Sequence, residues 1–200
     1  MKSLGGLLDR VVESRRRRWQ AKTWPGVKAT TYVDRTARVA RRADVRLGEK
    51  GHIARFCDVD VRSCGSVRVG DRVFLDQRTR LASTGGRLSI GADCFIGSDA
   101  IIAAGTAGLV IGRDCLIGPG VWIFAENHVF ARTDIPVNQQ GMTSKGIVIG
   151  DDVWIGARSL VLDGVSIGDH CVIAAGSVVT RSLAAGSVCA GSPAKLVRFR

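Results

Sequence analysis

Proline, histidine and long apolar runs are scarce in this sequence, and each shortage excludes a class of protein. There are 4 prolines among 200 residues, so the 25 glycines belong neither to a collagen-like chain nor to a proline-rich low-complexity chain. The longest apolar run without a charged residue, Ala100–Gly112, has 13 residues, whereas a membrane-spanning helix needs about 20. Charged residues interrupt the first 20 positions, so the apolar segment of a secretory signal is missing. We therefore expect a cytoplasmic globular domain with a short appended segment.

Positive charge is concentrated near the N-terminus. The formal net charge is +11 overall, of which residues 1–50 carry +9 and residues 51–200 carry +2. Leucine and valine recur at helical spacing between Leu4 and Val12, and Arg15–Arg18 follow. We expect residues 1–25 to form a basic amphipathic helix that either contacts an anionic membrane surface through residues 1–19, at its inner face, or caps the fold. No nucleic-acid-binding motif accompanies the arginines, so we expect no nucleic-acid partner.

A period of six residues runs through most of the chain and determines the predicted fold. Fifteen positions in this register are all Leu, Ile or Val, the next residue is most often glycine, and a small residue stands four positions after the aliphatic one. The fifteen positions are Val69, Leu75, Leu81, Ile90, Ile96, Ile102, Ile111, Ile117, Ile123, Ile149, Ile155, Val161, Ile167, Ile173 and Val179. A helix would repeat every 3.6 residues and a half-buried strand every 2, so this period indicates short strands separated by corners.

Three such units make a triangular coil of 18 residues with its aliphatic side chains inside. The blocks that begin at Val69, Ile90 and Ile111 are 21 residues apart, so each of these coils is expanded at one corner, within residues 82–89 and 103–110. We predict an all-β fold, a parallel β-helix over residues 30–183, with a tail over residues 184–200. Because Ser192 and Pro193 are typical of a helix start, we expect the tail to be a short helix.

Cysteine and histidine do not form a metal-site pattern. The six cysteines contain no CxxC pair, and Cys57, Cys94, Cys115 and Cys171 fall on the small interior position, so we expect buried thiols and no metal. The three histidines are His52, His128 and His170. We expect His52 and His170 to be solvated corner residues.

His128 lies where the repeat breaks. The segment 124–148 has no six-residue register, and an insertion this long in a compact domain is usually functional or disordered. A histidine alone in a loop is more often an ordinary surface residue than a catalyst. The residues that follow the break, however, contain VWIGA at 153–157 and GSPAK at 191–195.

Together with NHVF at 127–130, these motifs resemble the hexapeptide-repeat acyltransferases, and most closely the lipopolysaccharide, capsular polysaccharide, galactoside and maltose O-acetyltransferases. The resemblance covers roughly residues 88–200 and implies a left-handed parallel β-helix, acetyl-CoA as the acyl donor and a saccharide acceptor. It also implies a homotrimer with active sites between subunits. The acceptor would be held by segment 124–148 and the two expanded corners.

The resemblance assigns roles to individual residues. His128 matches the catalytic general base, and the Ala157 backbone N–H matches an oxyanion donor for which many relatives add a serine hydroxyl. Glu126 is close enough in sequence to orient the imidazole, although a solvated carboxylate is the alternative. The implied CoA contacts are Trp154, Gly156, Ala157, Ala175, Thr180, Arg181, Lys195 and Arg198. From the sequence alone, Trp154 could equally pack a corner and Lys195 and Arg198 could be an ordinary basic terminus.

Other functions of the same fold are less well supported. An amino-sugar or antibiotic acyltransferase would share the chemistry and differ in acceptor. A γ-type carbonic anhydrase needs three zinc-binding histidines around one interface, which His52, His128 and His170 do not supply. A non-catalytic scaffold predicts that replacing His128 has no effect on acyl transfer.

Overall fold

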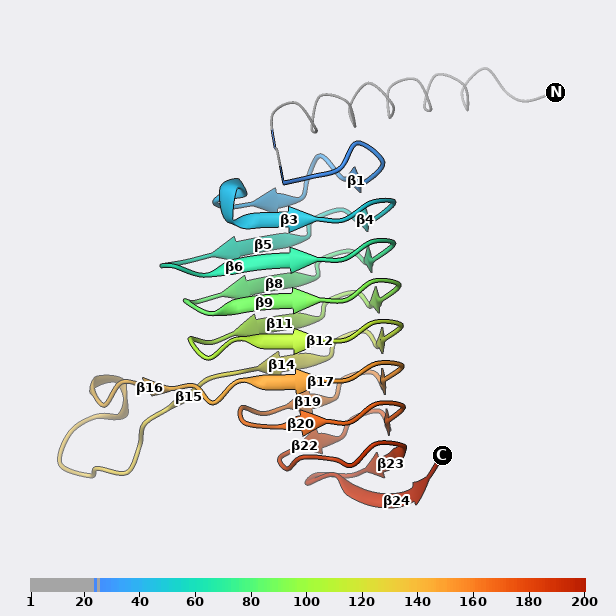
Figure 1. Ribbon diagram of the computed structural model, residues 1–200. Helices are drawn as coiled ribbons and strands as arrows, with labels where there is room; N and C mark the ends of the chain where they lie inside the picture. Colours follow the sequence, from blue (N-terminus) through green and yellow to red (C-terminus); the bar gives the residue numbers. More distant parts are fainter. Residues whose placement is uncertain (1–23, 25) are drawn as a thin grey trace.

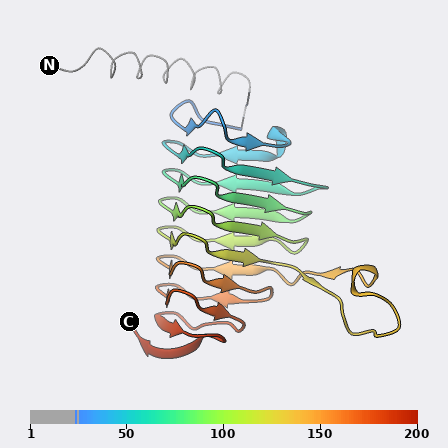
Figure 2. The same cartoon turned by 180° about the vertical axis from the view of Figure 1, so that it is seen from behind.

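The computed structural model describes residue 24 and residues 26–200, which form a parallel β-helix. The chain winds coil upon coil through three faces, from β1 at one end to β24 at the other (Figures 1 and 2). This is the left-handed hexapeptide-repeat architecture expected from the sequence. The expected N-terminal helix over residues 1–25, and the membrane contact through residues 1–19, fall outside the described residues.

The strands stack in three sheets, one on each face of the prism. The nine-stranded face contains β1 (Tyr32–Val33), β4 (His52–Ile53), β7 (Phe74–Leu75), β10 (Phe95–Ile96), β13 (Leu116–Ile117), β18 (Trp154–Ile155), β21 (Val172–Ile173), β23 (Ser187–Ala190) and β24 (Lys195–Phe199). The seven-stranded face contains β2 (Arg38–Val39), β5 (Asp58–Val61), β8 (Arg80–Ser83), β11 (Ile101–Ala104), β14 (Trp122–Phe124), β19 (Leu160–Val161) and β22 (Val178–Val179). The six-stranded face contains β3 (Val45–Leu47), β6 (Ser66–Val69), β9 (Arg87–Ile90), β12 (Leu109–Ile111), β17 (Ile147–Ile149) and β20 (Ser166–Ile167).

Three corners connect these faces. The first corner leads from the six-stranded to the nine-stranded face, the second from the nine-stranded to the seven-stranded face, and the third from the seven-stranded to the six-stranded face. Short 3-10 turns at Arg42–Asp44 and Val137–Gln139 and a hairpin of β15 (Asn127–His128) and β16 (Met142–Thr143) complete the described elements. The hairpin leaves the prism at the third corner, between β14 and β17 (Figure 1).

Glycine after many of the inward aliphatic residues lets neighbouring corners approach closely. At the second corner, a Cβ atom added to Gly118 would lie 2.7 Å from the Ala157 nitrogen, and one added to Gly156 would lie 2.5 Å from the Ala175 nitrogen. Real Cβ atoms do not approach backbone so closely, so these positions need glycine. The strands on either side can therefore stay in hydrogen-bonded register, with Leu116 opposite Trp154 and Ile117 opposite Ile155.

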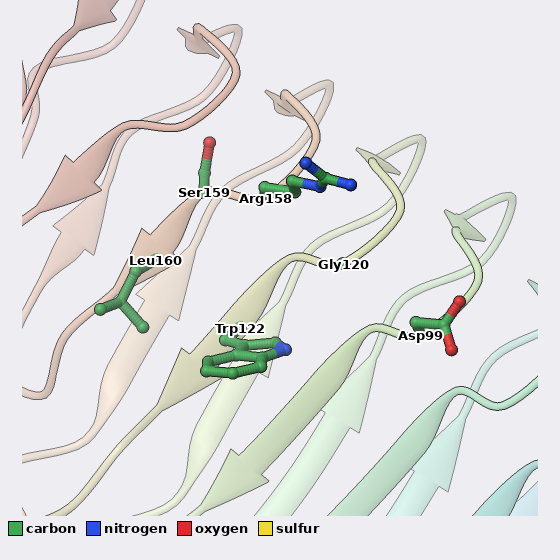
Figure 3. Close-up of a pocket in the computed structure, with 6 residues that line it drawn as sticks. All are labelled: Asp99, Gly120, Trp122, Arg158, Ser159 and Leu160. Atoms are coloured by element: carbon green, nitrogen blue, oxygen red, sulfur yellow. The ribbon is translucent and has the colours of Figure 1, made fainter.

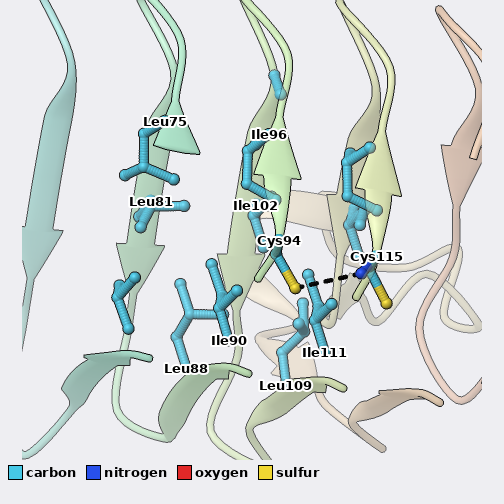
Figure 4. Packing of buried hydrophobic residues seen from close by; sticks show 14 of the residues in the cluster. Leu75, Leu81, Leu88, Ile90, Cys94, Ile96, Ile102, Leu109, Ile111 and Cys115 are labelled. Atoms are coloured by element: carbon cyan, nitrogen blue, oxygen red, sulfur yellow. Dashed lines mark hydrogen bonds between the residues drawn. The ribbon is translucent and has the colours of Figure 1, made fainter. Parts of the chain in front are cut away.

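The core is a stack of aliphatic side chains inside the prism (Figure 4). Leu75, Ile96 and Ile117 follow one another in parallel register on one face, and each is at most 1% exposed. Burying one such side chain stabilises a fold by about 1.5–3 kcal/mol, so this column contributes a large share of the stability. The prediction that these positions face inward is confirmed.

The four cysteines predicted to be interior are buried, as is Cys189, whereas Cys64 is exposed. The Cys115 backbone N–H lies 3.4 Å from the Cys94 sulfur on the preceding coil (Figure 4). Burial raises the pKa of the Cys57 thiol to about 11, which keeps it protonated at neutral pH. These thiols fill space in the core.

Two local predictions were wrong. The tail is not helical, because residues 195–199 form β24, which pairs antiparallel with β23 and satisfies the backbone groups at that sheet edge. His52 is not a solvated corner residue either. Its ring is stacked between Tyr32 and Phe74, with centroids 4.7 and 4.6 Å away, because the outward positions of β1, β4 and β7 are in register.

Candidate functional site

His128 projects from the prism on the β15–β16 hairpin. It lies opposite Met142 in antiparallel register, and the Val129 N–H donates to the Gly141 carbonyl at 3.0 Å. Both His128 and Met142 are exposed in the single chain. The hairpin thus presents the imidazole beyond the third corner, where it is free to meet a second molecule.

The base of the hairpin is fastened to the expanded corners below it. The Ser144 hydroxyl donates to the Ala125 carbonyl at 2.6 Å and accepts the Ala107 N–H at 3.0 Å. The Thr84 hydroxyl lies 3.0 Å from the Glu126 carboxylate, which therefore faces the preceding coils. Within the described residues no hydrogen bond joins Glu126 to His128, so the orienting role of Glu126 stays a prediction.

The second corner brings together three of the residues predicted to contact CoA. Gly156 and Ala157 form the corner after β18, and Ala175 lies in the corresponding turn of the next coil. No acceptor among the described residues takes the Ala157 N–H, and the same is true of the Ala175 N–H. A row of unpaired donors along a shallow corner suits a ligand that carries amide and carbonyl groups.

The other predicted CoA residues are spread around this end of the prism. Trp154 points outward from β18 and is 54% exposed. Lys195 lies at the start of β24, opposite Ala190 on β23, and β23 in turn pairs with β21, the strand that precedes Ala175. Arg198 lies further along β24, opposite Val188. Thr180 and Arg181 follow β22 and are exposed at the third corner of that coil, away from Ala157.

The predicted base and the predicted oxyanion donor are therefore at different corners of one chain. His128 leaves the third corner, whereas Ala157 belongs to the second, and the seven-stranded face separates them. Neither feature is closed over by the rest of the described chain.

A cavity of about 390 Å³ opens at the second corner, where Arg158, the residue after Ala157, lines it (Figure 3). Its lining is Asp99, Gly120, Trp122, Arg158, Ser159 and Leu160. Sequence reasoning missed Trp122 and Arg158. The signal available was that Trp122 directly precedes an inward aliphatic residue, and so had to point outward from its strand.

A second hollow, of about 310 Å³, lies on the six-stranded face below the hairpin. Val110 and Val148 line it, and Arg87 and Lys145 stand at its edge. It adjoins the expanded corner at Ala107–Leu109, one of the segments expected to contact the acceptor.

Across residues 24 and 26–200, no three His, Cys, Asp or Glu side chains come together as metal ligands. In the same residues no helix reaches the length and hydropathy of a membrane span.

Comparison with known families identifies the repeat. Residues 146–181 match the family described as bacterial transferase hexapeptide (six repeats), and residues 87–125 match the hexapeptide repeat of succinyl-transferase. No curated protein matches the chain.

Three solved structures that are similar to this chain in fold are acyltransferases. The N-acyltransferase AntD from Bacillus cereus, in complex with dTDP and 3-hydroxybutyryl-CoA, has a TM-score of 0.63 at 19% identity, over 92% of this chain and 88% of that one. A hexapeptide-repeat acetyltransferase from Vibrio cholerae in complex with acetyl-CoA is 34% identical over 56% of this chain and 60% of that one, with a TM-score of 0.51. The polySia-specific acetyltransferase NeuO has a TM-score of 0.50 at 21% identity, over 87% of this chain and 82% of that one.

Proposed function

We propose that this chain, which carries the hexapeptide repeats of bacterial transferases, is an acetyl-CoA-dependent O-acetyltransferase acting on a sugar hydroxyl in surface polysaccharide or lipopolysaccharide biosynthesis. The observation that carries the proposal is the exposed His128 on its fastened hairpin. The 34%-identical acetyltransferase with bound acetyl-CoA supports the choice of donor.

In the proposed reaction His128 acts as general base. A sugar hydroxyl is a weak nucleophile at neutral pH, and an imidazole within hydrogen-bond reach can remove its proton as the oxygen attacks the thioester carbonyl. The C–S bond then breaks, and the proton held by His128 passes to the departing CoA thiolate. No acyl-enzyme forms. A backbone N–H at Ala157 would stabilise the oxyanion of the tetrahedral intermediate, and it has no other acceptor among the described residues.

The proposed CoA groove follows the second corner toward the C-terminal end. Gly156, Ala157 and Ala175 would line the pantetheine, since small residues form these turns; Ala175 is exposed, Ala157 is half-buried and Gly156 is buried. Lys195 and Arg198 would meet the phosphates. Trp154 would contact the remaining parts of the cofactor, and Thr180 and Arg181, which lie at the third corner, would do so from the neighbouring chain of the trimer proposed below.

We further propose a homotrimer in which His128 of one chain meets the groove of its neighbour. The separation of His128 and Ala157 on different corners supports this arrangement, because a rotational assembly brings different surfaces of identical chains together. The exposed Trp122 and Trp154, which are 48% and 54% accessible in the single chain, supply apolar surface near such a seam.

We also propose that residues 1–19 hold the enzyme at the cytoplasmic face of the membrane. The support is their sequence, an apolar helical pattern followed by Arg15–Arg18. Sedimentation of the full chain with anionic liposomes at low salt tests this. Cosedimentation that is lost at high salt would support the contact, and a protein that stays in the supernatant at low salt would contradict it.

The acetyltransferase proposal is tested by thiol release from acetyl-CoA in the presence of a panel of saccharides. We expect release with at least one neutral or acidic sugar, a loss of about 10²–10⁴-fold in His128→Ala, and full activity in His170→Ala. Equal activity of His128→Ala and the wild type would overturn the proposal. Acylation of amino sugars alone would replace the O-acetyl assignment with N-acyl transfer.

A further inference from the structure

We infer that the cavity at Trp122 and Arg158 is an acceptor subsite for a saccharide ring that carries an anionic group, a carboxylate or a phosphate. The inference rests on the proposed function and extends it, since it names the class of acceptor. The cavity, about 390 Å³ in volume, is large enough for a sugar ring, and its lining includes Arg158, the residue after the proposed oxyanion donor.

The cavity lies where Gly120, at the second corner, has no side chain, and Gly176, which also lacks one at this corner, does not line it. The second corner carries Arg78, Asp99, Gly120 and Arg158 on successive coils, each with a positive φ. At Gly120 the φ is 66°, and a Cβ atom there would lie 3.4 Å from the Arg158 side chain. The absent side chain leaves a gap between Asp99 and Arg158 (Figure 3).

An aromatic surface forms one wall of this gap. Trp122 is 48% exposed, and its indole packs edge-on against Phe124, with centroids 6.2 Å apart and planes at 75°. Leu160, which is paired with Trp122 on the adjacent strand, extends the apolar surface. The ring is thus held in place while one face stays available to the apolar face of a sugar.

The charges of the cavity favour an anion. Among the described residues no carboxylate pairs with Arg158, whereas Asp99 is bound by Arg78 through contacts of 2.7 and 2.8 Å. This pairing lowers the pKa of Asp99, so its carboxylate stays ionised and balanced by Arg78. The guanidinium of Arg158 remains uncompensated, and its planar donors suit a carboxylate or a phosphate.

The position of the cavity matches the end of the groove where an acceptor is needed. Arg158 directly follows Ala157, and Asp99 and Gly120 lie on the coils that precede it. Lys195, proposed to meet the CoA phosphates, is at the other end of the same corner. A cofactor with its phosphates at Lys195 therefore points its thioester toward the cavity.

The test is saccharide binding to the full chain with CoA bound, followed by calorimetry. The probes are trigalacturonic acid, glucose 1-phosphate and, as the uncharged comparison, maltotriose. We expect at least one acidic probe to bind more tightly than maltotriose, and Arg158→Gln to weaken that probe about tenfold, the loss of one charge-assisted contact. Trp122→Ala should weaken every saccharide that binds. Arg68→Gln, an exposed arginine on β6 of the six-stranded face, is the matched control and should have no effect.

Several results would overturn the inference. They are equal binding of maltotriose and the acidic probes, no binding of either acidic probe at millimolar concentration, and a loss that follows Arg68→Gln in place of Arg158→Gln. A loss of CoA affinity in Arg158→Gln as large as its loss of saccharide affinity would assign the cavity to the donor. A titration with CoA and no saccharide distinguishes this inference from the proposed function. If the wild type binds CoA but neither acidic saccharide, the subsite is contradicted and the proposed acetyltransferase function is not. Trp122 and Arg158 are exposed, so thermal melting should show both variants folded.

Discussion

His128 and Ala157 lie on opposite sides of the seven-stranded face, at two different corners of the same prism. The imidazole extends outward on a hairpin, and the unpaired Ala157 N–H lies in a turn of the coil itself. Acyl transfer needs the base and the oxyanion donor within a few ångströms of one substrate. In the proposed trimer, the chain would therefore supply the two halves of the site to two different neighbours.

Gly118→Ala should destabilise the prism and disturb the proposed groove together. The new Cβ would lie 2.7 Å from the Ala157 nitrogen and 3.0 Å from its Cα, both of them backbone atoms that cannot move alone. We expect a loss of about 1–3 kcal/mol, seen as a fall of several degrees in Tm, with weaker CoA binding. Gly85→Ala is the control, since its nearest neighbour is the Thr106 methyl at 3.3 Å. Equal melting temperatures for the two variants would contradict this account of the corner.

Asp93→Asn should reduce stability at neutral pH and have less effect in acid. Arg72 holds the Asp93 carboxylate through two contacts of 2.6 Å, and this hydrogen bonding lowers the pKa of Asp93. A carboxylate whose pKa is lower in the folded than in the unfolded chain stabilises the fold at a pH above its unfolded-state pKa. This stabilisation is lost as the pH falls toward and through its folded-state pKa. The difference in Tm between wild type and variant should therefore shrink as the pH falls below about 4.

Asparagine tolerates the positive φ of 61° at this position, so the substitution removes the charge with little backbone change. Thermal melts of both proteins from pH 3 to 7 make the measurement. A difference that grows toward low pH would contradict the assigned role of the pair.

One cysteine should react in the folded protein. Cys64 is exposed, whereas Cys57, Cys94, Cys115, Cys171 and Cys189 are buried, and burial raises the pKa of Cys57 and Cys171. Iodoacetamide at pH 8 should modify one thiol per chain quickly, and Cys64→Ser should abolish that reaction. Mass spectrometry counts the additions. Rapid modification of two or more thiols in the native chain would contradict the burial of the other five cysteines.

The six-residue repeat, and which of its side chains point into the core, could be predicted from the sequence for a physical reason. A coil buries one aliphatic side chain per strand, so positions such as Ile96 and Ile117 recur every six residues and the period is visible without a structure. The three extra residues per coil predicted expanded corners. Thr84 and Ala107 lie in these corners and contact Glu126 and Ser144 at the base of the hairpin.

Features that depend on contacts between different coils could not be predicted from the sequence alone. Residues 195–199 form a strand because β23 offers an open edge, which outweighs the local helix signal of Ser192 and Pro193. The stacking of His52 depends on the register of three coils. The cavity beside Trp122 requires Gly120 to lie between Asp99 and Arg158, which are 59 residues apart in sequence and close at one corner.

The most direct measurement of the central claim is complementation between two inactive chains. His128→Ala lacks the base, and Ala157→Trp, or Ala175→Trp if the first fails to fold, obstructs the groove. The two chains are expressed together with different tags and purified through both. In any mixed trimer one seam of three joins an intact His128 to an intact groove, so activity should return to about one third of wild type. Mixed trimers as inactive as either parent would contradict a site shared between chains.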